Sequence, residues 1–585
     1  MLNWLLGKIK RIGYWIPGLP ELLTYNVAYI RSDFMAGISV AAVALPTSIA
    51  YAQLAGLPPQ AGLYSTILPM IAYTFFGTSR QLIVGPDAAT CAMFASALAP
   101  IASAIHNPEY YQSLALTLTL LAGILFIIAG SLRMGFLADL QSRPILMGLM
   151  NGVAIMIIVG QLGNITGIPV TGKDTIGKLQ SFLSSLNQFH WMTLLLSATL
   201  FTLFYGLQYQ YKRIPAILAV AVTAVILSLI FSFELRGIHI VGEIPSALPG
   251  LNPPAIPHEQ LGSLFFGAIA LVFVSFVSAS LTAHTFATKN NYEIDDNREL
   301  IALGVANISS GLCQGFTISG ADSRTAVNEA AGGKTRVAQL FAALTILCAL
   351  ILFIKPIGYM PLAALGVILI CSAIKLTNFP ALMRLRKYSK SEFLVALFTF
   401  VSVLLLGVIY AVILAILLSI LSFLRKTARP QDHCLGLLPD QDHFYELGLY
   451  PNAQEVPGLL LYRFGASLIF LNANYFRQRI LALINRTDTP PVRWVVVDGT
   501  SINNIDITAL MMLSDLGKTL ALRGIVLAFV DQTNHLQKWL KVHEIPADEV
   551  TVKIYATKFE VLAAYRDANK DYLEAEENKN TQSAP

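Results

Sequence analysis

Long runs of apolar residues recur along most of this chain, and they constrain its fold more than any other feature. Many of them approach or exceed the roughly 20 residues that a helix needs to cross a bilayer. Because 55% of the 585 residues are hydrophobic and only 13% are charged, the chain is not an ordinary soluble protein. Hydropathy alone predicts about 12 to 14 spans. The runs lie at about 34–55, 61–77, 88–105, 113–132, 144–163, 191–207, 214–232, 261–287, 299–313, 323–332, 337–354, 361–374 and 392–424.

The basic residues of the connecting segments predict the orientation of the chain. Lysine and arginine are concentrated on the cytoplasmic side of membrane proteins, and most basic residues here share one side if the number of spans is even. Only Lys173, Lys178, Arg236 and Lys355 fall on the other side. We therefore expect a multi-pass protein of the cell (inner) membrane with both termini in the cytoplasm. The same bias explains the net charge of +5 without a nucleic-acid partner.

One stretch within these runs, GFTISGADSRTAVN at 315–328, places polar side chains where hydrocarbon is expected. An ionisable side chain at membrane depth is costly unless it faces a cavity or a partner, so Arg324 marks a functional site. Gly315 and Gly320 permit an extended backbone. A helix that begins near Ser323 would direct its free N–H groups and the positive end of its dipole into the cavity. This field favours an anion.

A second stretch repeats the pattern in the first half of the chain. Residues 84–90 (VGPDAAT) and 319–325 (SGADSRT) share a helix breaker, an aspartate, small residues and a threonine that open a short apolar segment. Two interrupted segments at matching places in two halves are typical of transporters built from inverted repeats.

The character of the chain changes near residue 430. A basic stretch at 425–429 ends the last apolar run, and strands then alternate with helices at a spacing that predicts a small sheet with helices packed against it. The predicted strands are 458–464, 467–471, 493–498 and 525–530, and the predicted helices are 473–484, 506–522 and 532–540.

A series of motifs runs in order along the membrane part. They are DFMAGI at 33–38, LPTSIAYAQLAGLPP at 45–59, GLYS at 62–65, GTSRQL at 77–82, VGEIP at 241–245, NRELIALG at 297–304, SRTAVN at 323–328 and GKT at 333–335. The series resembles the SulP family of anion permeases, the sulfate-transporter-like solute carriers. That resemblance implies a polytopic α-helical membrane protein of about 14 spans in a 7+7 inverted repeat, like the uracil transporters. It also implies a core that carries substrate and a gate that forms the contact of a homodimer.

The resemblance further implies that the third and tenth spans are half-helices whose N-termini meet at mid-membrane. Carried over residue by residue, the third span opens at 86–89 and the tenth at 322–325. A hydroxyl donor, a fixed positive charge and two helix N-termini suit an oxyanion. The candidate substrate-binding residues are Ser323, Arg324, Thr325, Asp87, Ala88, Ala89, Thr47 and Phe316.

The sequence departs from the family's usual pattern at positions that bear on coupling. Thr47 stands where many members carry Gln or Glu, and Ser278 stands where an acidic residue is common. Asp87 and Asp322 instead lie at the two half-helix starts. An ionised aspartate there would weaken the field that attracts an anion, so we expect one or both to take up a proton or to have Na⁺ beside them. The coupling candidates are Asp87, Asp322 and Ser278.

Structural roles are the alternative for the same residues. Asp is a preferred N-cap, so Asp87 and Asp322 are also expected if they only cap their helices. Arg324 is equally expected if it only forms an ion pair with Asp322, Asp87 or Glu329.

Enzyme activity has no support in the sequence. The GGKT segment at 332–335 resembles the end of a phosphate-binding loop, but it lacks the first glycine and a preceding strand. The five cysteines form no C-x-x-C pair, so neither a disulfide framework nor a metal site is expected, and no cofactor is implied.

The C-terminal part contains a second set of motifs. They are YRF at 462–464, FLNANYF at 470–476, VVVDG at 495–499, IDITAL at 505–510 and RGI at 523–525. They resemble STAS domains, which terminate many such permeases. Signalling relatives are phosphorylated on a hydroxyl that matches Thr508, so Thr508 is a candidate for regulation. The alternative is that the domain serves folding and dimer assembly.

Together these observations predict five parts. They are a cytosolic N-terminal lead-in (1–30), a transmembrane transport domain (31–426), a linker (427–445), a cytosolic α/β STAS domain (446–570) and a disordered tail (571–585). The lead-in has no small-residue cleavage site and is not expected to be a cleaved signal peptide.

These features predict a dimeric secondary active transporter in the lipid bilayer, in which the core moves against the gate as an elevator. Its cargo is expected to be a small inorganic or organic anion such as sulfate, bicarbonate or a dicarboxylate, coupled to H⁺ or Na⁺. One alternative is a chloride-permeable anion exchanger or channel-like member. Another is a non-transporting, membrane-anchored protein that signals through its STAS domain.

Overall fold

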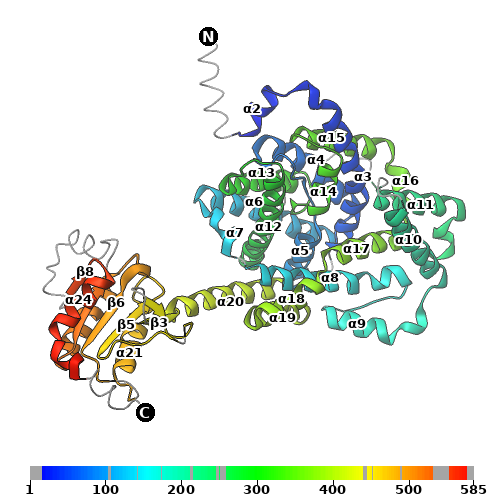
Figure 1. Cartoon of the computed structure of the whole chain (residues 1–585). Coiled ribbons are helices and arrows are strands. Elements are labelled where there is room, and N and C mark those ends of the chain that lie inside the picture. The colour runs from blue at the N-terminus through cyan, green and yellow to red at the C-terminus, as the bar shows by residue number, and fades with distance from the viewer. Residues whose placement is uncertain are drawn as a thin grey trace, which may run out of the picture. The chain divides into compact units, whose positions relative to one another are not determined.

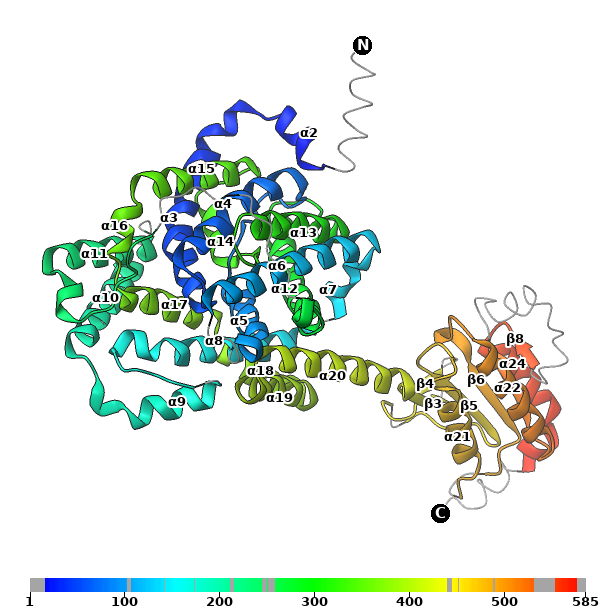
Figure 2. The same ribbon diagram turned by 180° about the vertical axis from the view of Figure 1, so that it is seen from behind.

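The structure is a computed structural model that describes residues 16–102, 107–140, 142–172, 174–210, 215–244, 250, 258–438, 444–450, 452–487, 490–530 and 553–575. The chain forms two compact units, Met1–Ser419 and Ile420–Pro585. The described part of the first unit is helical apart from one pair of two-residue strands, whereas the second contains a six-stranded sheet (Figures 1 and 2).

The first unit is a bundle of helices of very different lengths. In its first half they are α2 (Gly18–Leu23), α3 (Ile30–Leu54), α4 (Pro59–Phe76), α5 (Ala88–Ala102), α6 (Pro108–Ser131), α7 (Leu137–Leu140), α8 (Arg143–Thr166), α9 (Thr175–Ser184), α10 (Trp191–Gln210) and α11 (Ala216–Phe231). In its second half they are α12 (Leu261–Lys289), α13 (Asp296–Leu312), α14 (Asp322–Ala330), α15 (Val337–Leu352), α16 (Ile354–Gly358), α17 (Leu362–Leu376), α18 (Phe379–Tyr388) and α19 (Lys390–Leu406). Helix α20 (Val408–Ala428) runs into the second unit.

Several of these helices have the length and composition of membrane spans. Among the described residues, 7 helices are long and apolar enough to cross a bilayer: Val27–Leu54, Pro108–Ser131, Arg143–Thr166, Trp191–Gln210, Leu261–Lys289, Leu362–Tyr388 and Val408–Ala428. Shorter apolar helices lie at Ala88–Ala99, Ala216–Phe231 and Val337–Leu352. The architecture is that of a multi-pass helical membrane protein, and the count of fourteen spans stays a prediction.

The helices pack in two groups. Helices α3, α4, α6, α12, α13 and α15 pack on one another, and α8 packs with α17 and α19. The views in Figures 1 and 2 place α10 and α11 at the end of the unit away from α6 and α13. The α6–α13 contact is unusually close, because a Cβ added to Gly123 or Gly304 would collide with the backbone of the other helix.

The second unit is an α/β domain. Its sheet has the order β4-β3-β5-β6-β7-β8, in which β5 to β8 are parallel and β3 is antiparallel to both its neighbours. Side chains alternate across β5, so that Tyr462 faces α21 and α22 while Leu461 faces α24. The strands are β3 (Asp432–Leu437), β4 (Phe444–Glu446), β5 (Leu459–Phe464), β6 (Trp494–Asp498), β7 (Val526–Val530) and β8 (Lys553–Tyr555), and the helices are α21 (Ala473–Ile484), α22 (Ile507–Ala521) and α24 (Lys558–Ala568).

Some predicted boundaries of this domain differ from the structure. The range 427–445, predicted as a linker, contains β3 and β4, because β3 pairs with β5 through four register partners from Asp432 to Leu435. The predicted strand 467–471 is reduced to a single parallel bridge between Leu468 and Ile505, and the Phe470 N–H donates to the Asp506 carboxylate at 2.6 Å.

The structure describes only part of each end of the chain, and the described part of the C-terminal tail differs from its prediction. Residues 571–575 of the predicted disordered tail are helical, and the ring of Tyr572 lies 4.0 Å from the guanidinium carbon of Arg493. The predicted helix 532–540, the rest of the tail and residues 1–15 of the lead-in lie outside the described residues.

Candidate functional site

Two short strands join the interrupted segments of the two halves. Strand β1 (Val84–Gly85) pairs antiparallel with β2 (Ser319–Gly320), with Val84 opposite Gly320, and all four residues are buried. A helix begins just beyond each strand: α5 at Ala88 after β1, and α14 at Asp322 after β2. The pairing therefore brings the N-termini of α5 and α14 together inside the first unit.

Side chains hold this pairing in place from both sides. The hydroxyl of Thr325 accepts a hydrogen bond from the Ile83 N–H at 3.1 Å and donates to the Ala321 carbonyl at 2.8 Å. The side-chain amide of Gln339, on α15, donates to the Leu82 carbonyl at 2.8 Å and accepts from the Val84 N–H at 3.3 Å. Because its hydroxyl is used for these bonds, Thr325 supports the site and does not offer a donor to a ligand.

Arg324 is the central charge of the site. Its side chain is 1% exposed, and its Nη2 donates to the Thr47 hydroxyl at 3.2 Å and to the Ser48 hydroxyl at 3.0 Å. Its Nη1 is buried and has no hydrogen-bond partner. A buried donor without a partner costs about 1–3 kcal/mol, and more for a charged group. One guanidinium nitrogen is therefore left for a ligand.

The described residues show no contact ion pair for Arg324, which was the alternative expectation. Arg324 forms no ion pair there with Asp87, Asp322 or Glu329. Glu329 is instead bound by Lys289 at 3.0 Å. Both hydroxyls that bind Arg324 belong to α3, which is neither of the two predicted half-helices.

Two neighbours fix the position of the guanidinium. Thr47 donates its own hydroxyl proton to the Val43 carbonyl at 2.8 Å, so its lone pairs are free to accept from Arg324. Gly85 has no side chain, and a Cβ at this position would collide with Arg324 Nη1. A larger residue at this position would therefore force the guanidinium to shift.

The two aspartates differ. Asp87 caps α5: its carboxylate accepts from the Thr90 N–H at 3.1 Å, and its carbonyl accepts from the Cys91 N–H at 3.0 Å. Asp322 is the first residue of α14, whose N-cap is Ala321, and its carboxylate accepts from the Thr282 hydroxyl of α12. The capping alternative thus describes Asp87 but not Asp322.

The remaining predicted site residues differ in their exposure to solvent. Asp322 and Ser323 are exposed at the start of α14, whereas Ala88 and Ala89 are buried at the start of α5. Ser278 lies one turn before Thr282 on α12, and its carbonyl accepts from the Thr282 hydroxyl at 3.0 Å. The exposed hydroxyl and carboxylate therefore belong to α14.

Phe316 lies behind the site. Its side chain is fully buried and packs on Phe94, with ring centroids 5.6 Å apart. Its N–H is bound by the Ser65 hydroxyl at 2.7 Å, and its carbonyl accepts from Ser310 at 2.6 Å. These contacts fix the approach to β2 and leave Phe316 without a free polar group.

Sequence reasoning missed three contributors to the site. Ser48 and Thr282 lie on apolar helices, where a hydroxyl leaves almost no trace in hydropathy, and Gly85 is one glycine among 40. The only available signal was position: Ser48 follows Thr47, and Gly85 lies in the repeated pattern at 84–90.

The phosphate-loop decoy has a structural explanation. In the GGKT segment, the N–H groups of Lys334 and Thr335 bind the Asp33 carboxylate at 2.7 and 3.1 Å, so they hold a side chain of α3. Within the described ranges, no group of three or more His, Cys, Asp or Glu side chains could hold a metal ion.

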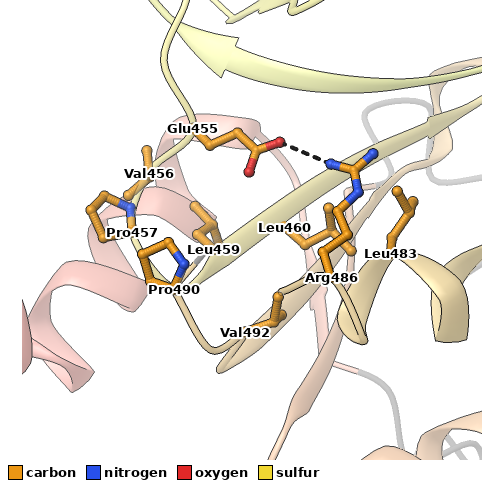
Figure 3. A pocket seen from close by; sticks show the side chains of 10 residues that line it. Glu455, Val456, Pro457, Leu459, Leu460, Leu483, Arg486, Pro490 and Val492 are labelled. Atoms are coloured by element: carbon orange, nitrogen blue, oxygen red, sulfur yellow. Dashed lines mark hydrogen bonds and ion pairs between the residues drawn. The ribbon is translucent and has the colours of Figure 1, made fainter. Parts of the chain in front are cut away.

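The second unit contains the predicted regulatory residue and a separate small cavity. Thr508 is exposed in the first turn of α22, whose N-cap Asp506 accepts from the Ala509 N–H at 2.8 Å. The cavity, of about 120 Å³, lies beside Leu459 and Leu483, and the ion pair of Arg486 with Glu455 at 3.4 Å lies at its edge (Figure 3). None of the predicted site residues lines it.

Comparison with known families agrees with both parts of the chain. The sulfate permease family matches residues 30–399, and the STAS domain matches residues 450–558. The predicted resemblance to SulP permeases with a STAS domain is therefore confirmed. The family consists of transporters, not enzymes.

Individual relatives extend the agreement over nearly the whole chain. A probable sulfate transporter of Mycobacterium tuberculosis is 38% identical over 527 residues, which cover 90% of this chain and 94% of the relative. Probable sulfate transporter 3.3 of Arabidopsis thaliana is 29% identical over 91% of this chain and 88% of its own length.

Solved structures agree in fold. The murine solute carrier 26 family member A9 anion transporter, in an inward-facing state, superposes with a TM-score of 0.86 at 23% identity over 96% of this chain and 95% of that one. The transmembrane domain of the cyanobacterial bicarbonate transporter BicA gives a TM-score of 0.58 at 24% identity over 68% and 98%. From the family match, the aligned relatives and the shared fold together, the chain belongs to the sulfate permease family and carries a C-terminal STAS domain.

Proposed function

We propose that this chain is a secondary active transporter whose cargo, a small oxyanion, binds between the N-termini of α5 and α14. The observation that carries the proposal is the buried guanidinium of Arg324, which keeps one nitrogen without a partner where two helices begin. Helix N-termini and arginine are the groups that proteins use to bind oxyanions. Ser323, exposed at the same helix start, would add a hydroxyl donor.

Sulfate is the cargo that the relatives favour. The relatives in Mycobacterium tuberculosis and Arabidopsis thaliana are named as probable sulfate transporters, and the bacterial one is 38% identical to this chain. Bicarbonate is the second candidate, because BicA shares the fold of the first unit. Both are oxyanions and suit the same donors, as does a dicarboxylate.

Coupling is proposed at Asp322. Its carboxylate is exposed at the start of α14 and binds one hydroxyl, that of Thr282. A proton or Na⁺ that arrives with the anion would offset this negative charge and restore the positive field of the helix end. Asp87 already caps α5, and Ser278 lies one turn from Thr282, so both stand further from this role.

The remaining proposals concern the assembly. We propose that α5 and α14 move with the core helices against the gate as an elevator, in a homodimer with both termini and the STAS domain in the cytoplasm. Thr508 is exposed at the start of α22, and a phosphate there would be tolerated by the helix dipole.

Reconstitution tests the proposal directly. Full-length protein in proteoliposomes should accumulate labelled sulfate, and unlabelled sulfate, bicarbonate, chloride, fumarate and succinate should compete in the order of their affinity. Uptake should rise when an inward H⁺ or Na⁺ gradient is imposed. Uptake that is insensitive to both gradients would remove coupling, and conductive chloride flux would favour the channel-like alternative. Protein that moves no anion would instead support a membrane-anchored signalling role.

A further inference from the structure

A polar cleft of about 630 Å³ lies in the first unit, apart from the proposed anion site. One wall is the N-terminal arm, defined here as residues 17–29, and the others are the loops that follow α4, α12 and α14. The loops contribute Arg80, Tyr292 and Lys334, among other residues. A volume of this size is within the range of pockets that bind small ligands.

The cleft contains cations without counter-charges. Arg80 and Lys334 are exposed and form no ion pair in the part of the chain that the structure describes. The guanidinium of Arg80 lies over the ring of Tyr292, 5.3 Å from its centroid, which holds the charge at the cleft. A third cation, Arg336, is already paired with Glu21. Two of the three cations that line the cleft therefore have no ion-pair partner among the described residues.

Nearby carboxylates keep their negative charge, but their oxygens are occupied by other groups, and none of them forms an ion pair with Arg80 or Lys334 in the described residues. Asp33 accepts from the Lys334 N–H at 2.7 Å, from the Thr335 hydroxyl at 2.6 Å and from the Tyr25 hydroxyl at 3.0 Å. Glu329, which reaches the edge of the cleft through Asn290, is paired with Lys289 at 3.0 Å.

A third acid is held by neutral donors, as Asp33 is, mainly from the loop after α4. Glu299 accepts from the N–H groups of Thr78 at 2.6 Å and Ser79 at 2.9 Å and from the Tyr73 hydroxyl at 2.6 Å. The two unpaired cations therefore remain available to an anion from outside the chain.

The arm also indicates where that anion comes from. Thr24, Asn26 and Tyr29 line the cleft, while Leu23 and Val27 on the same arm are 61% and 72% exposed. Large apolar side chains beside a basic surface are typical of segments that lie in the membrane interface. The loops of the cleft connect helices of the membrane bundle, so they too belong at the bilayer surface.

We propose that this cleft binds the phosphate group of an anionic lipid headgroup, with Arg80 and Lys334 as its two cationic contacts. Each cation near an anionic bilayer surface strengthens binding, and arginine adds paired donors for phosphate oxygens. The arm's apolar side chains would enter the bilayer beside the bound headgroup. Inorganic phosphate presents the same oxygens, so the test must separate the two sources.

The test is titration calorimetry on the detergent-purified full chain with dioctanoyl phosphatidic acid as the probe. We expect saturable binding that the double variant Arg80→Gln, Lys334→Gln weakens by at least about tenfold, since two charge-assisted contacts are lost. Dioctanoyl phosphatidylcholine should not bind. A matched control, Arg384→Gln with Lys387→Gln on α18, removes two exposed cations outside the cleft and should change affinity less than about twofold.

Further arms keep the outcome decisive. The variant Arg80→Lys, Lys334→Arg keeps both charges and should bind the probe, which separates loss of charge from misfolding. If inorganic phosphate displaces the probe at similar concentrations, the phosphate chemistry stands and the free anion is its source; if it does not, the lipid is. Equal weakening by the two glutamine variants, or undiminished binding by the cleft variant, would overturn the proposal.

Discussion

The two units of this protein each bury a charged side chain, and they treat it in opposite ways. In the STAS domain, Asp498 is fully buried and is bound by Arg463 and Lys558, each at 2.9 Å, and by Thr500. In the membrane unit, Arg324 is equally buried but is held only by two neutral hydroxyls, and one of its nitrogens has no partner.

We interpret the difference as that between a structural charge and one proposed to bind a ligand. A buried ion pair with its hydrogen bonds complete has nothing left to offer a ligand, and its loss is felt as instability. A buried cation with an unused donor carries a free-energy cost that a bound anion would remove. Both side chains are buried. Arg324 differs from Asp498 because one of its nitrogens has no hydrogen-bond partner.

The strongest test of this contrast is the removal of the functional charge. Arg324→Ala should lower anion uptake in proteoliposomes about 1,000-fold, because truncation of a buried, hydrogen-bonded charge costs about 4 kcal/mol. The variant should still elute as folded protein, since no ion pair of the described residues is broken. The control is Arg384→Ala, an exposed arginine on α18. Normal uptake by the first variant would remove Arg324 from the mechanism.

Removal of the structural charge should have the reverse outcome. Asp498→Ala leaves Arg463 and Lys558 facing an empty carboxylate position and should destabilise the STAS domain by about 3 kcal/mol. Hydrogen exchange of β5 and β6 peptides in the full chain measures this change. Asp515→Ala, at an exposed position of α22, is the control. An unchanged exchange rate for Asp498→Ala would contradict the structural role.

A smaller effect is expected from moving Arg324 without removing it. Gly85→Ala places a Cβ against Nη1, so the guanidinium must shift and uptake should fall about tenfold, or about 1.4 kcal/mol. Gly206→Ala, in α10 with no atom within 4 Å of the added Cβ, should leave uptake unchanged. Equal uptake by the two variants would mean that the position of the guanidinium is not critical.

The two aspartates of the site provide a finer comparison. Asp87→Asn keeps a capping oxygen and should change uptake less than about threefold, because Asn caps as well as Asp. Asp322→Asn removes the only carboxylate proposed to couple, so uptake should lose its response to H⁺ or Na⁺ gradients. Measurement of both variants with and without a gradient separates the roles. A gradient response retained by Asp322→Asn would move coupling elsewhere.

The smallest expected effect is the pH dependence of the structural charge. Burial alone would raise the pKa of Asp498, but hydrogen bonds from Lys558 and Thr500 hold it below its ordinary value. Its stabilisation is therefore complete above the pKa of about 3.9 of an unfolded aspartate and is lost as pH falls through the lower folded pKa. Calorimetry of the full chain should show the STAS transition falling on acidification below about pH 4. Asp498→Asn should flatten that fall, and an identical slope would contradict this origin.

Sequence alone located Arg324 but not its partners. A charge inside an apolar run is visible in any hydropathy profile, and the glycines beside it predicted the break in the helix. Thr47 was predicted at the site, but Ser48 lies 276 residues from Arg324, and a hydroxyl on an apolar helix has no pattern that indicates its neighbour. The predicted ion pairs failed for the same reason, since charge sign alone does not specify which side chains the fold brings together.

The STAS domain was predicted more evenly. Helix α21 was predicted at its observed bounds, because its apolar period and flanking residues are local features. Strand β3 was not predicted, because it forms by pairing with β5, a strand that lies later in the sequence. The segment 467–471 has the composition of a strand, but its pairing is limited to one bridge from Leu468 to Ile505, and the Phe470 N–H binds the Asp506 carboxylate.

The pairing of β1 with β2 has a consequence for how cargo can be released. In the proposed site, α5 and α14 start from hydrogen-bonded neighbours, so we expect the two helix starts to move together. Separation of the two helix starts would break the hydrogen bonds between β1 and β2 and the hydrogen bonds that Thr325 and Gln339 make on either side of them. For the proposed site, we therefore expect the surrounding helices to control access and the affinity for cargo to be the same on both sides of the membrane.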